Sequence, residues 1–500
     1  MPSLLSLPLE LLGQIVEETI PVDFEATALS CRTLFAASAP FRAQYTTRRK
    51  RFRNFTFSRK VDTELEGGEE SDSGEHWDEM TQETGIRIMT TRKLLEEVAL
   101  DHSVAQYIQS IDLRGHGDEE EDEEILTSLE AEVPETLKNL VLASPFVEAF
   151  AGDPDDWIGE IRWSGIYADV FLLTLLSQVR KLALHPRWDE LDPFNNTSAH
   201  KHLWPVLELI THRANHFKEF PGAPLSMLSV LQPSRDIGYD ERSPLTPFVP
   251  FLAINSLSEA SLGSCIFKDD GYTGIPFDPL VECYSINLRK LILESCVAGP
   301  EELSQLLSRI PNLEVFEFSH ETKWHGCGHN WNSGAFLDTV QNICAKTLKK
   351  LSVTILTHWG NKGATLVDMT RFQKLAVLEL DVDMLCSHPY HPSMRDLEWD
   401  EFESVGSPAW PKLIEMLPAS IEKFNLYLNT FSDDDLNCIT HLIEGLSDCR
   451  ATKLPHLDKL SLFVRMDSGP RIPDVALEAL NAAKRNGFSI LKLGTSIPLL

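Results

Sequence analysis

The feature that most constrains this chain is a short apolar pattern that recurs from residue 108 onward. The pattern is apolar-x-x-apolar-x-apolar, and it occurs twelve times at intervals of about 25–46 residues. Self-similarity at such a period is typical of architectures in which each unit buries its apolar side against its neighbours. The matches are Ile108/Ile111/Leu113, Leu137/Leu140/Leu142, Val179/Leu182/Leu184, Leu225/Leu228/Val230, Leu257/Ala260/Leu262, Leu288/Leu291/Leu293, Leu313/Phe316/Phe318, Leu348/Leu351/Val353, Leu375/Leu378/Leu380, Ile421/Phe424/Leu426, Leu457/Leu460/Leu462 and Phe488/Leu491/Leu493.

Each match predicts a short strand with an inward face. Its last two apolar residues are two positions apart, the spacing at which side chains of a strand point to the same side. Between the matches, residues 300–310, 433–446 and 474–486 carry helical apolar spacing. An ordinary α/β sheet would also alternate strands and helices, but twelve units in one chain favour a stacked solenoid.

A further position of the pattern supports a family resemblance. Cys265, Cys296 and Asn429 stand three residues after the last apolar position, where a small polar group would face inward. With these residues the pattern resembles the leucine-rich repeat, although Pro145, Asp383 and Arg465 occupy that position elsewhere. The resemblance implies an α/β fold: an irregular solenoid over residues 93–500, with parallel strands on its concave face and helices and loops on its convex face. Insertions are expected near 114–125, 319–346 and 382–411.

Residues 1–45 read as a separate small helical domain. Pro8 suits a first helical turn, and Leu11, Leu12 and Ile15 recur at helical spacing. Short helices cannot bury that much apolar surface among themselves, so an exposed face that needs a partner is expected. The alternative is a helical cap on the repeats.

The same segment resembles an F-box. The resemblance rests on LPLELL at 7–12, on Ile15 and on LSCRTL at 29–34; Thr27 and Ala28 depart from the usual Leu-Ser. The register is that of fungal F-box proteins in which repeats follow. The resemblance implies docking on the Skp-type adaptor of a Skp–cullin–F-box ubiquitin ligase. The residues that would form or support that interface are Leu7, Pro8, Leu11, Leu12, Ile15, Leu29, Cys31 and Leu34.

Residues 46–92 are expected to be a linker that is basic and then acidic. The basic run at 46–53 (TTRRKRFR) fits a solvated helix end, a linker or a nuclear-import signal. Residues 62–83 are acidic and poor in apolar side chains, and 118–124 (DEEEDEE) reads as a solvated insertion. Neither acidic tract has the ligand order and turn glycine of a calcium loop.

Charge and cysteine usage restrict the partners and the compartment. With 75 acidic and 45 basic residues the chain carries a formal charge of −30, which counts against nucleic-acid and membrane-surface binding. No apolar run approaches the ~20 residues needed to span a bilayer, and no secretory signal is expected from residues 1–12, which lack a basic start and an unbroken apolar stretch. The nine cysteines look like thiols of a reducing compartment. A cytoplasmic or nuclear protein is expected.

No catalytic residue, metal or cofactor is predicted. The chain lacks the common nucleotide-binding, serine-hydrolase and zinc-protease motifs. His325, Cys327 and His329 could share one side of a strand, with His320 as a fourth ligand, but their spacing differs from that of zinc sites. The glycine and aromatic content around them instead suits a loop on a ligand-facing rim.

The expected function is substrate recognition, not catalysis. The F-box would dock on the adaptor and, through it, a cullin, while the repeats bind a protein target for ubiquitination. The alternative is a scaffold that acts outside a ligase.

Outward positions of the strands form two expected rows. One contains Lys181, Lys290, Lys350, Lys423 and Lys459, and the next contains Asp112, Glu317, Glu379, Asn425 and Lys492. From these rows we predict target binding by Lys290, Lys350, Lys423, Glu317 and Glu379. The alternative is that the lysines only pair with adjacent acids.

Overall fold

The computed structural model of the chain forms two compact units with mixed α/β structure. It describes residues 7–57, 88–114, 132–163, 165–234, 236–268, 275–279, 284–323, 331–358, 362–364, 368–385, 388–389, 410–429, 431–465 and 476–493. The first unit is Met1–Ser234 with Ile254–Leu257, and the second is Arg235–Ala253 with Ser258–Leu500. No helix among these residues is long and apolar enough to cross a membrane.

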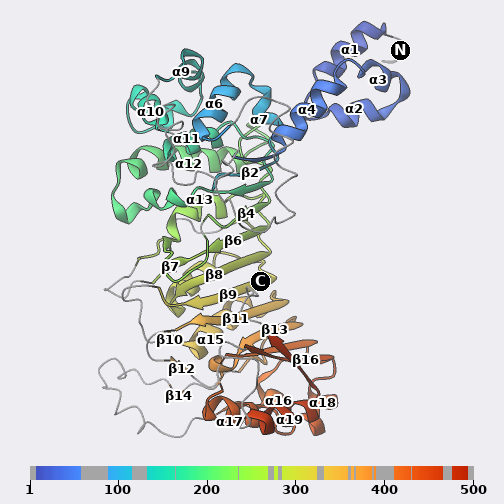
Figure 1. Ribbon diagram of the computed structural model, residues 1–500, viewed down its shortest axis with the longest axis vertical. Helices are drawn as coiled ribbons and strands as arrows, with labels where there is room; N and C mark the ends of the chain where they lie inside the picture. The colour runs from blue at the N-terminus through green and yellow to red at the C-terminus, as the bar shows by residue number, and fades with distance from the viewer. Residues whose placement is uncertain are drawn as a thin grey trace, which may run out of the picture. The chain divides into compact units, whose positions relative to one another are not determined.

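The first unit begins with three short helices, as the sequence predicts. They are α1 (Leu9–Glu17), α2 (Phe24–Ser30) and α3 (Arg32–Ala37), drawn in blue in Figure 1. Leu12 and Val16 lie one turn apart on α1 and are both almost completely buried, as are Phe24 and Leu34. These side chains form a small core that the three helices share.

The structure differs from the expected linker at residues 46–57. Helix α4 (Arg42–Phe52) runs through the basic segment and leads into strand β1 (Asn54–Thr56). Strand β1 pairs in parallel with β2 (Ser110–Asp112), and Phe55 at its centre is buried. A three-residue strand carries one inward side chain, too little for a pattern to detect. The acidic tracts at 62–83 and 118–124 lie outside the described residues.

The rest of the first unit places helices around a parallel sheet. The strand order is β1-β2-β3-β4, with β3 at Lys181–Ala183 and β4 at Val230–Gln232. The helices are α6 (Thr91–Leu100), α7 (Ser103–Tyr107), α9 (Glu135–Leu142), α10 (Pro154–Ile161), α11 (Ile166–Leu173) and α12 (Ser198–Asn215). Every residue of α11 is buried, which makes it the central helix of this unit.

Two predicted strands of this unit are wrong. Leu137, Leu140 and Leu142 lie on helix α9, because Leu137 and Val141 are one turn apart and both fully buried, while Leu142 is 49% exposed. In β4 the partner of Leu182 is Leu231, so the strand starts three residues later than the Leu225/Leu228/Val230 match indicates.

The second unit contains the longer strands, which pair in register except for shifts in β8 and β11. Its main strands follow the order β6-β8-β9-β11-β13-β15-β16-β17, all paired in parallel. Their bounds are β6 Glu259–Gly263, β8 Lys290–Ala298, β9 Val315–Glu321, β11 Lys350–Thr357, β13 Val377–Asp381, β15 Lys423–Leu428, β16 Lys459–Arg465 and β17 Phe488–Leu493.

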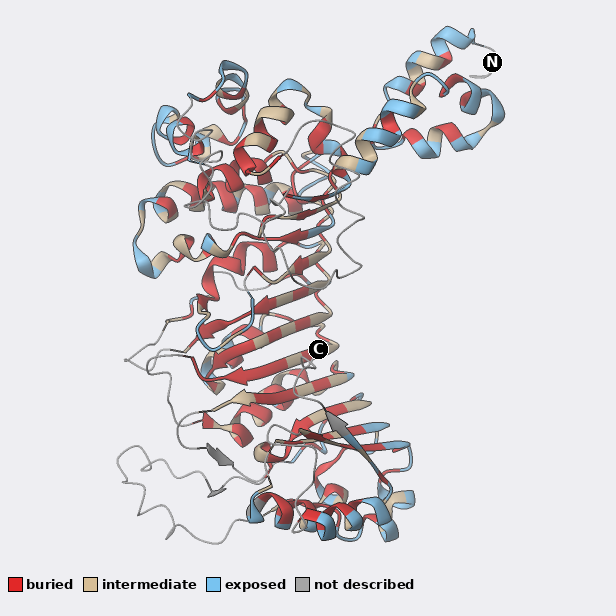
Figure 2. Cartoon of the chain, in the orientation of Figure 1, coloured by how far each residue is buried: buried red, intermediate tan, exposed pale blue. Residues whose placement is uncertain are grey.

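The register of this sheet confirms the predicted inward positions. Leu291, Phe316, Leu351, Leu378, Phe424 and Leu460 are partners across successive strands, and each is at most 2% exposed. Figure 2 shows the resulting alternation of buried and partly exposed residues along the strands. One face of the sheet is therefore core, and the other carries the two rows of polar positions.

The helices between these strands include one in each of the three segments predicted to be helical. They are α14 (Pro300–Leu307), α15 (Ser333–Cys344), α16 (Leu413–Met416), α17 (Asp433–Leu442), α18 (Leu446–Lys453) and α19 (Leu477–Arg485). The expected insertion at 319–346 instead contains the end of β9 and α15, whose apolar side is buried. The other two expected insertions lie largely outside the described residues. These are residues 115–125 of the first, and residues 386–387 and 390–409 of the second.

Short elements complete the two units. They are η2 (Val147–Ala149), η3 (Pro186–Leu191), η4 (Pro193–Asn195), β5 (Ser243–Pro244), η5 (Thr246–Phe248), α13 (Val249–Leu252), β7 (Cys265–Phe267), β10 (Trp331–Asn332), β12 (Lys362–Ala364), η6 (Val382–Met384) and β14 (His388–Pro389). Strands β10, β12 and β14 form a separate parallel sheet.

Strand β17, at the last match of the pattern, has a register different from the predicted one. Phe488 and Ile490 are the partners of Leu460 and Leu462, so they take the inward positions, while Leu491 is 39% exposed. Lys492 is consequently the partner of Val464 and does not continue the row of Asn425.

The predicted polar positions after the strands do face inward. Cys265 and Cys296 are fully buried, and the Cys265 amide donates to the Cys296 sulfur at 3.2 Å. Asn429 donates to the carboxylate of Asp381 at 2.5 Å. The free thiols in the described part are Cys31, Cys265, Cys296, Cys344 and Cys449, whereas Cys438 forms a disulfide, where the sequence predicts a thiol.

Candidate functional site

The eight residues predicted to contact an adaptor fall into three groups in the structure. Leu12 and Leu34 are buried and hold the three helices together. Ile15 and Cys31 are half-buried. Leu7, Pro8, Leu11 and Leu29 are exposed, with Leu11 at 44% and Leu29 at 75%. The exposed group is the part of the prediction that can contact another protein.

Further apolar side chains of the same helices are exposed. Leu9 on α1 and Phe35 on α3 lie in water, and the guanidinium of Arg42 covers the Phe35 ring at 4.2 Å. Covering such side chains yields about 25 cal/mol for each Å² of apolar surface removed from water. We call Leu7, Leu9, Leu11, Leu29 and Phe35 the exposed apolar set.

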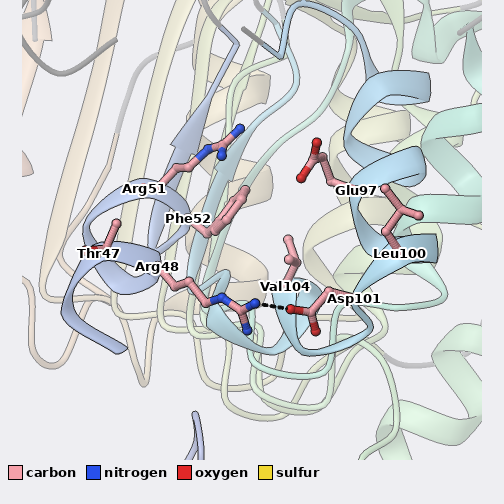
Figure 3. Close-up of a pocket in the computed structure, with 8 residues that line it drawn as sticks. All are labelled: Thr47, Arg48, Arg51, Phe52, Glu97, Leu100, Asp101 and Val104. Atoms are coloured by element: carbon pink, nitrogen blue, oxygen red, sulfur yellow. Dashed lines mark ion pairs between the residues drawn. The ribbon is translucent and has the colours of Figure 1, made fainter. Parts of the chain in front are cut away.

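Helix α4 uses much of its positive charge within the protein. Arg49 pairs with Glu25, and Arg48 pairs with Asp101 and donates to Ser103 at 3.0 Å. Beside this contact lies a cavity of about 200 Å³, lined by Phe52 and Val104 among others (Figure 3). The basic run therefore connects the three helices to α6 and α7 through local ion pairs.

The predicted lysines of the second unit do lie in one row. Lys290, Lys350, Lys423 and Lys459 occupy equivalent register positions, with Val315 and Val377 between them. Lys181 has the equivalent strand position in the first unit. We call these positions the lysine row.

Two members of the lysine row are held by acidic neighbours. Lys290 contacts Glu259 at 2.9 Å, and Lys350 contacts Glu317 at 2.9 Å and Glu379 at 3.6 Å. Partial burial opposes the charge of Lys350, but the two carboxylates prevail and raise its pKa. These contacts fit the alternative that the lysines only pair with adjacent acids. Lys423 and Lys459 form no ion pair with any described residue.

Sequence reasoning missed a buried polar cluster of the second unit. Lys323 has no exposed surface, and its ammonium donates to the Gly238 carbonyl at 2.7 Å and to Glu321 at 3.2 Å. It also contacts Ser264, which directly follows β6, and Ser295, which lies at the register shift within β8; both have left-handed backbone conformation. These contacts cross-link three chain segments. No periodic pattern marks an isolated lysine of this kind.

The possible metal ligands are only partly described. His325, Cys327 and His329 lie outside the described residues. His320 is buried, its Nε2 lies 3.0 Å from Nδ1 of His358, and Trp331 stacks on its ring at 4.3 Å. Within the described ranges no group of three or more potential ligands is arranged to hold a metal ion.

Asp381 is a buried carboxyl between neighbouring strands. Its oxygens accept the Ile355 amide proton at 2.5 Å and the Asn429 amide at 2.5 Å. Burial raises its pKa to about 8, despite these hydrogen bonds. Because the folded pKa exceeds the unfolded one, the folded state holds the extra proton, and stability falls as the pH rises toward 8.

We therefore expect the Asp381→Asn substitution to flatten the pH dependence of stability. From pH 6 to pH 8.5 the natural chain should lose about 2 kcal/mol more unfolding free energy than the variant. Urea titrations of both proteins at several pH values measure this difference. Identical slopes for the two proteins would contradict the assignment.

No protein-family model and no curated protein sequence matches the chain.

Proposed function

We propose that the chain is a non-catalytic substrate-recognition subunit of a Skp–cullin–F-box ubiquitin ligase. Its three N-terminal helices would bind a Skp-type adaptor, and its repeats would bind a protein target. The observation that carries the proposal is the exposed apolar set on helices whose sequence resembles an F-box. Leu12 and Leu34, by contrast, keep the helices folded.

The proposal includes a solenoid of leucine-rich-repeat type. Its support is the regular register of the second unit, in which parallel strands align their inward residues from Ala260 to Leu460. Helices α14 and α15 lie between successive strands, as such repeats require. A sheet of this kind presents rows of outward side chains to a protein ligand.

The alternative is a scaffold that uses the same helices without delivering targets for ubiquitination. Affinity purification of the tagged chain from cells with the proteasome inhibited separates the two. Recovery of both a Skp-type adaptor and a cullin supports the ligase. Adaptor without cullin favours the scaffold, and absence of both contradicts the proposal.

A further inference from the structure

A patch on β15 and β16 differs from the rest of the lysine row. Lys423 and Lys459 are direct partners across these parallel strands, and both are exposed. Like charges on directly opposite residues destabilise a sheet. No described acid lies within ion-pair distance of either ammonium, in contrast to Lys290 and Lys350. The pair therefore places two cations without a described ion-pair partner at adjacent positions, where one anion could contact both.

The next outward position on each strand carries unused hydrogen-bonding groups. Asn425 donates its amide to Glu379 at 2.9 Å, but its carbonyl oxygen has no partner among the described residues. The Ser461 hydroxyl also has none, although Ser461 has no exposed surface. Buried polar atoms without partners cost free energy. Both atoms are buried, so they lie beneath the surface that a ligand can contact.

The third outward position carries two aromatic rings. Tyr427 and Phe463 stack with their centroids 4.9 Å apart and their planes within 15°, and both residues are half-buried. A pair of this kind offers an apolar surface for a third planar group. Lys423 and Tyr427 are four residues apart on one strand, about 13 Å. An extended peptide spans the same length between residues i and i+4.

We propose that this patch, formed by Lys423, Lys459, Tyr427 and Phe463, recognises an extended segment of the target protein that carries one acidic side chain. A carboxylate of the segment contacts the two lysines. An aromatic side chain four residues away packs on Tyr427 and Phe463. The inference deepens the proposed target-binding role and depends on it.

The acidic residues around the patch favour a ligand segment with one negative charge over a ligand with several. Each lysine is preceded by an exposed acidic residue, Glu422 or Asp458, and Glu379 lies on the neighbouring strand. The whole chain carries −30. These charges repel a polyanion, so one carboxylate suits the site better than a phosphate cluster or a nucleic acid.

The test uses the full chain and four peptides of one Gly/Ser frame. The first carries Glu and Trp at positions i and i+4. The others replace Glu by Gln, Trp by Ala, or Glu by phosphoserine. Saturation-transfer NMR detects affinities into the millimolar range. We expect the Gln and Ala peptides to bind about tenfold more weakly than the first, equivalent to one good contact each.

Two protein variants complete the design. Lys423→Ala/Lys459→Ala should abolish the preference for Glu over Gln and keep the preference for Trp. The control Lys453→Ala/Lys484→Ala changes the net charge equally on α18 and α19 and should bind as the natural chain does. No binding of the first peptide, equal binding of all peptides, an unchanged preference in the first variant, or tighter binding of the phosphoserine peptide would overturn the proposal. Adaptor binding is absent from this assay, so failure here and failure of the proposed function are distinguishable.

Discussion

The Leu291→Asp substitution should unfold the second unit. Leu291 has no exposed surface and lies at the centre of the inward row, between Ala260 and Phe316. A carboxylate there has no cation to pair with and would be buried at a cost of about 5 kcal/mol. Equilibrium denaturation should show the loss of the cooperative transition, and limited proteolysis should cut within the sheet. Leu351→Asp should do the same, because Leu351 is equally buried.

The adjacent residue provides a matched control. Ile292 lies on the outward side of the same strand and is half-exposed. Ile292→Asp introduces the same charge one position away, where water solvates it, and should cost about 1 kcal/mol or less. Equal stability of the two variants would show that the inward and outward faces have been assigned wrongly.

The inward residues could be predicted because their spacing repeats. The same pattern contains Leu291, Phe316, Leu351 and Leu378. Many matches therefore support one assignment of the inward positions, and a chance match has little influence on it. Predictions were wrong where one match stood without such support. Leu137, Leu140 and Leu142 fit the pattern by chance, and the helical pair Leu137 and Val141 decides the structure.

Other features lie beyond sequence reasoning because they depend on contacts between distant segments. Lys323 and Ser264 are far apart in the chain, and only the bends after the strands bring them together. The rows Lys290–Lys459 and Glu317–Asn425 could be predicted from strand alternation. The sequence could not predict which of these lysines lack an ion-pair partner, because ion pairing depends on side-chain distances.

The exposure of each side chain also decides how the N-terminal helices should be tested. Sequence alone treats Leu11 and Leu12 as equivalent contacts to an adaptor. In the structure Leu12 is 1% exposed and Leu11 is 44% exposed. Changing both together would mix loss of folding with loss of binding. The two positions should therefore be changed separately.

Leu11→Glu should abolish adaptor binding and leave the helices folded. The charge is solvated in the free protein, but an apolar interface would bury it without a partner at a cost of several kcal/mol. We expect at least about a 100-fold loss of affinity for a purified Skp-type adaptor, measured by calorimetry. Leu12→Glu should instead destroy the helical core, visible as lost helical circular dichroism. Val22→Glu is the matched control, because Val22 is an exposed apolar residue in the turn between α1 and α2, outside the predicted interface. Normal affinity of Leu11→Glu, or equal loss in Val22→Glu, would show that the adaptor does not bind through the predicted residues.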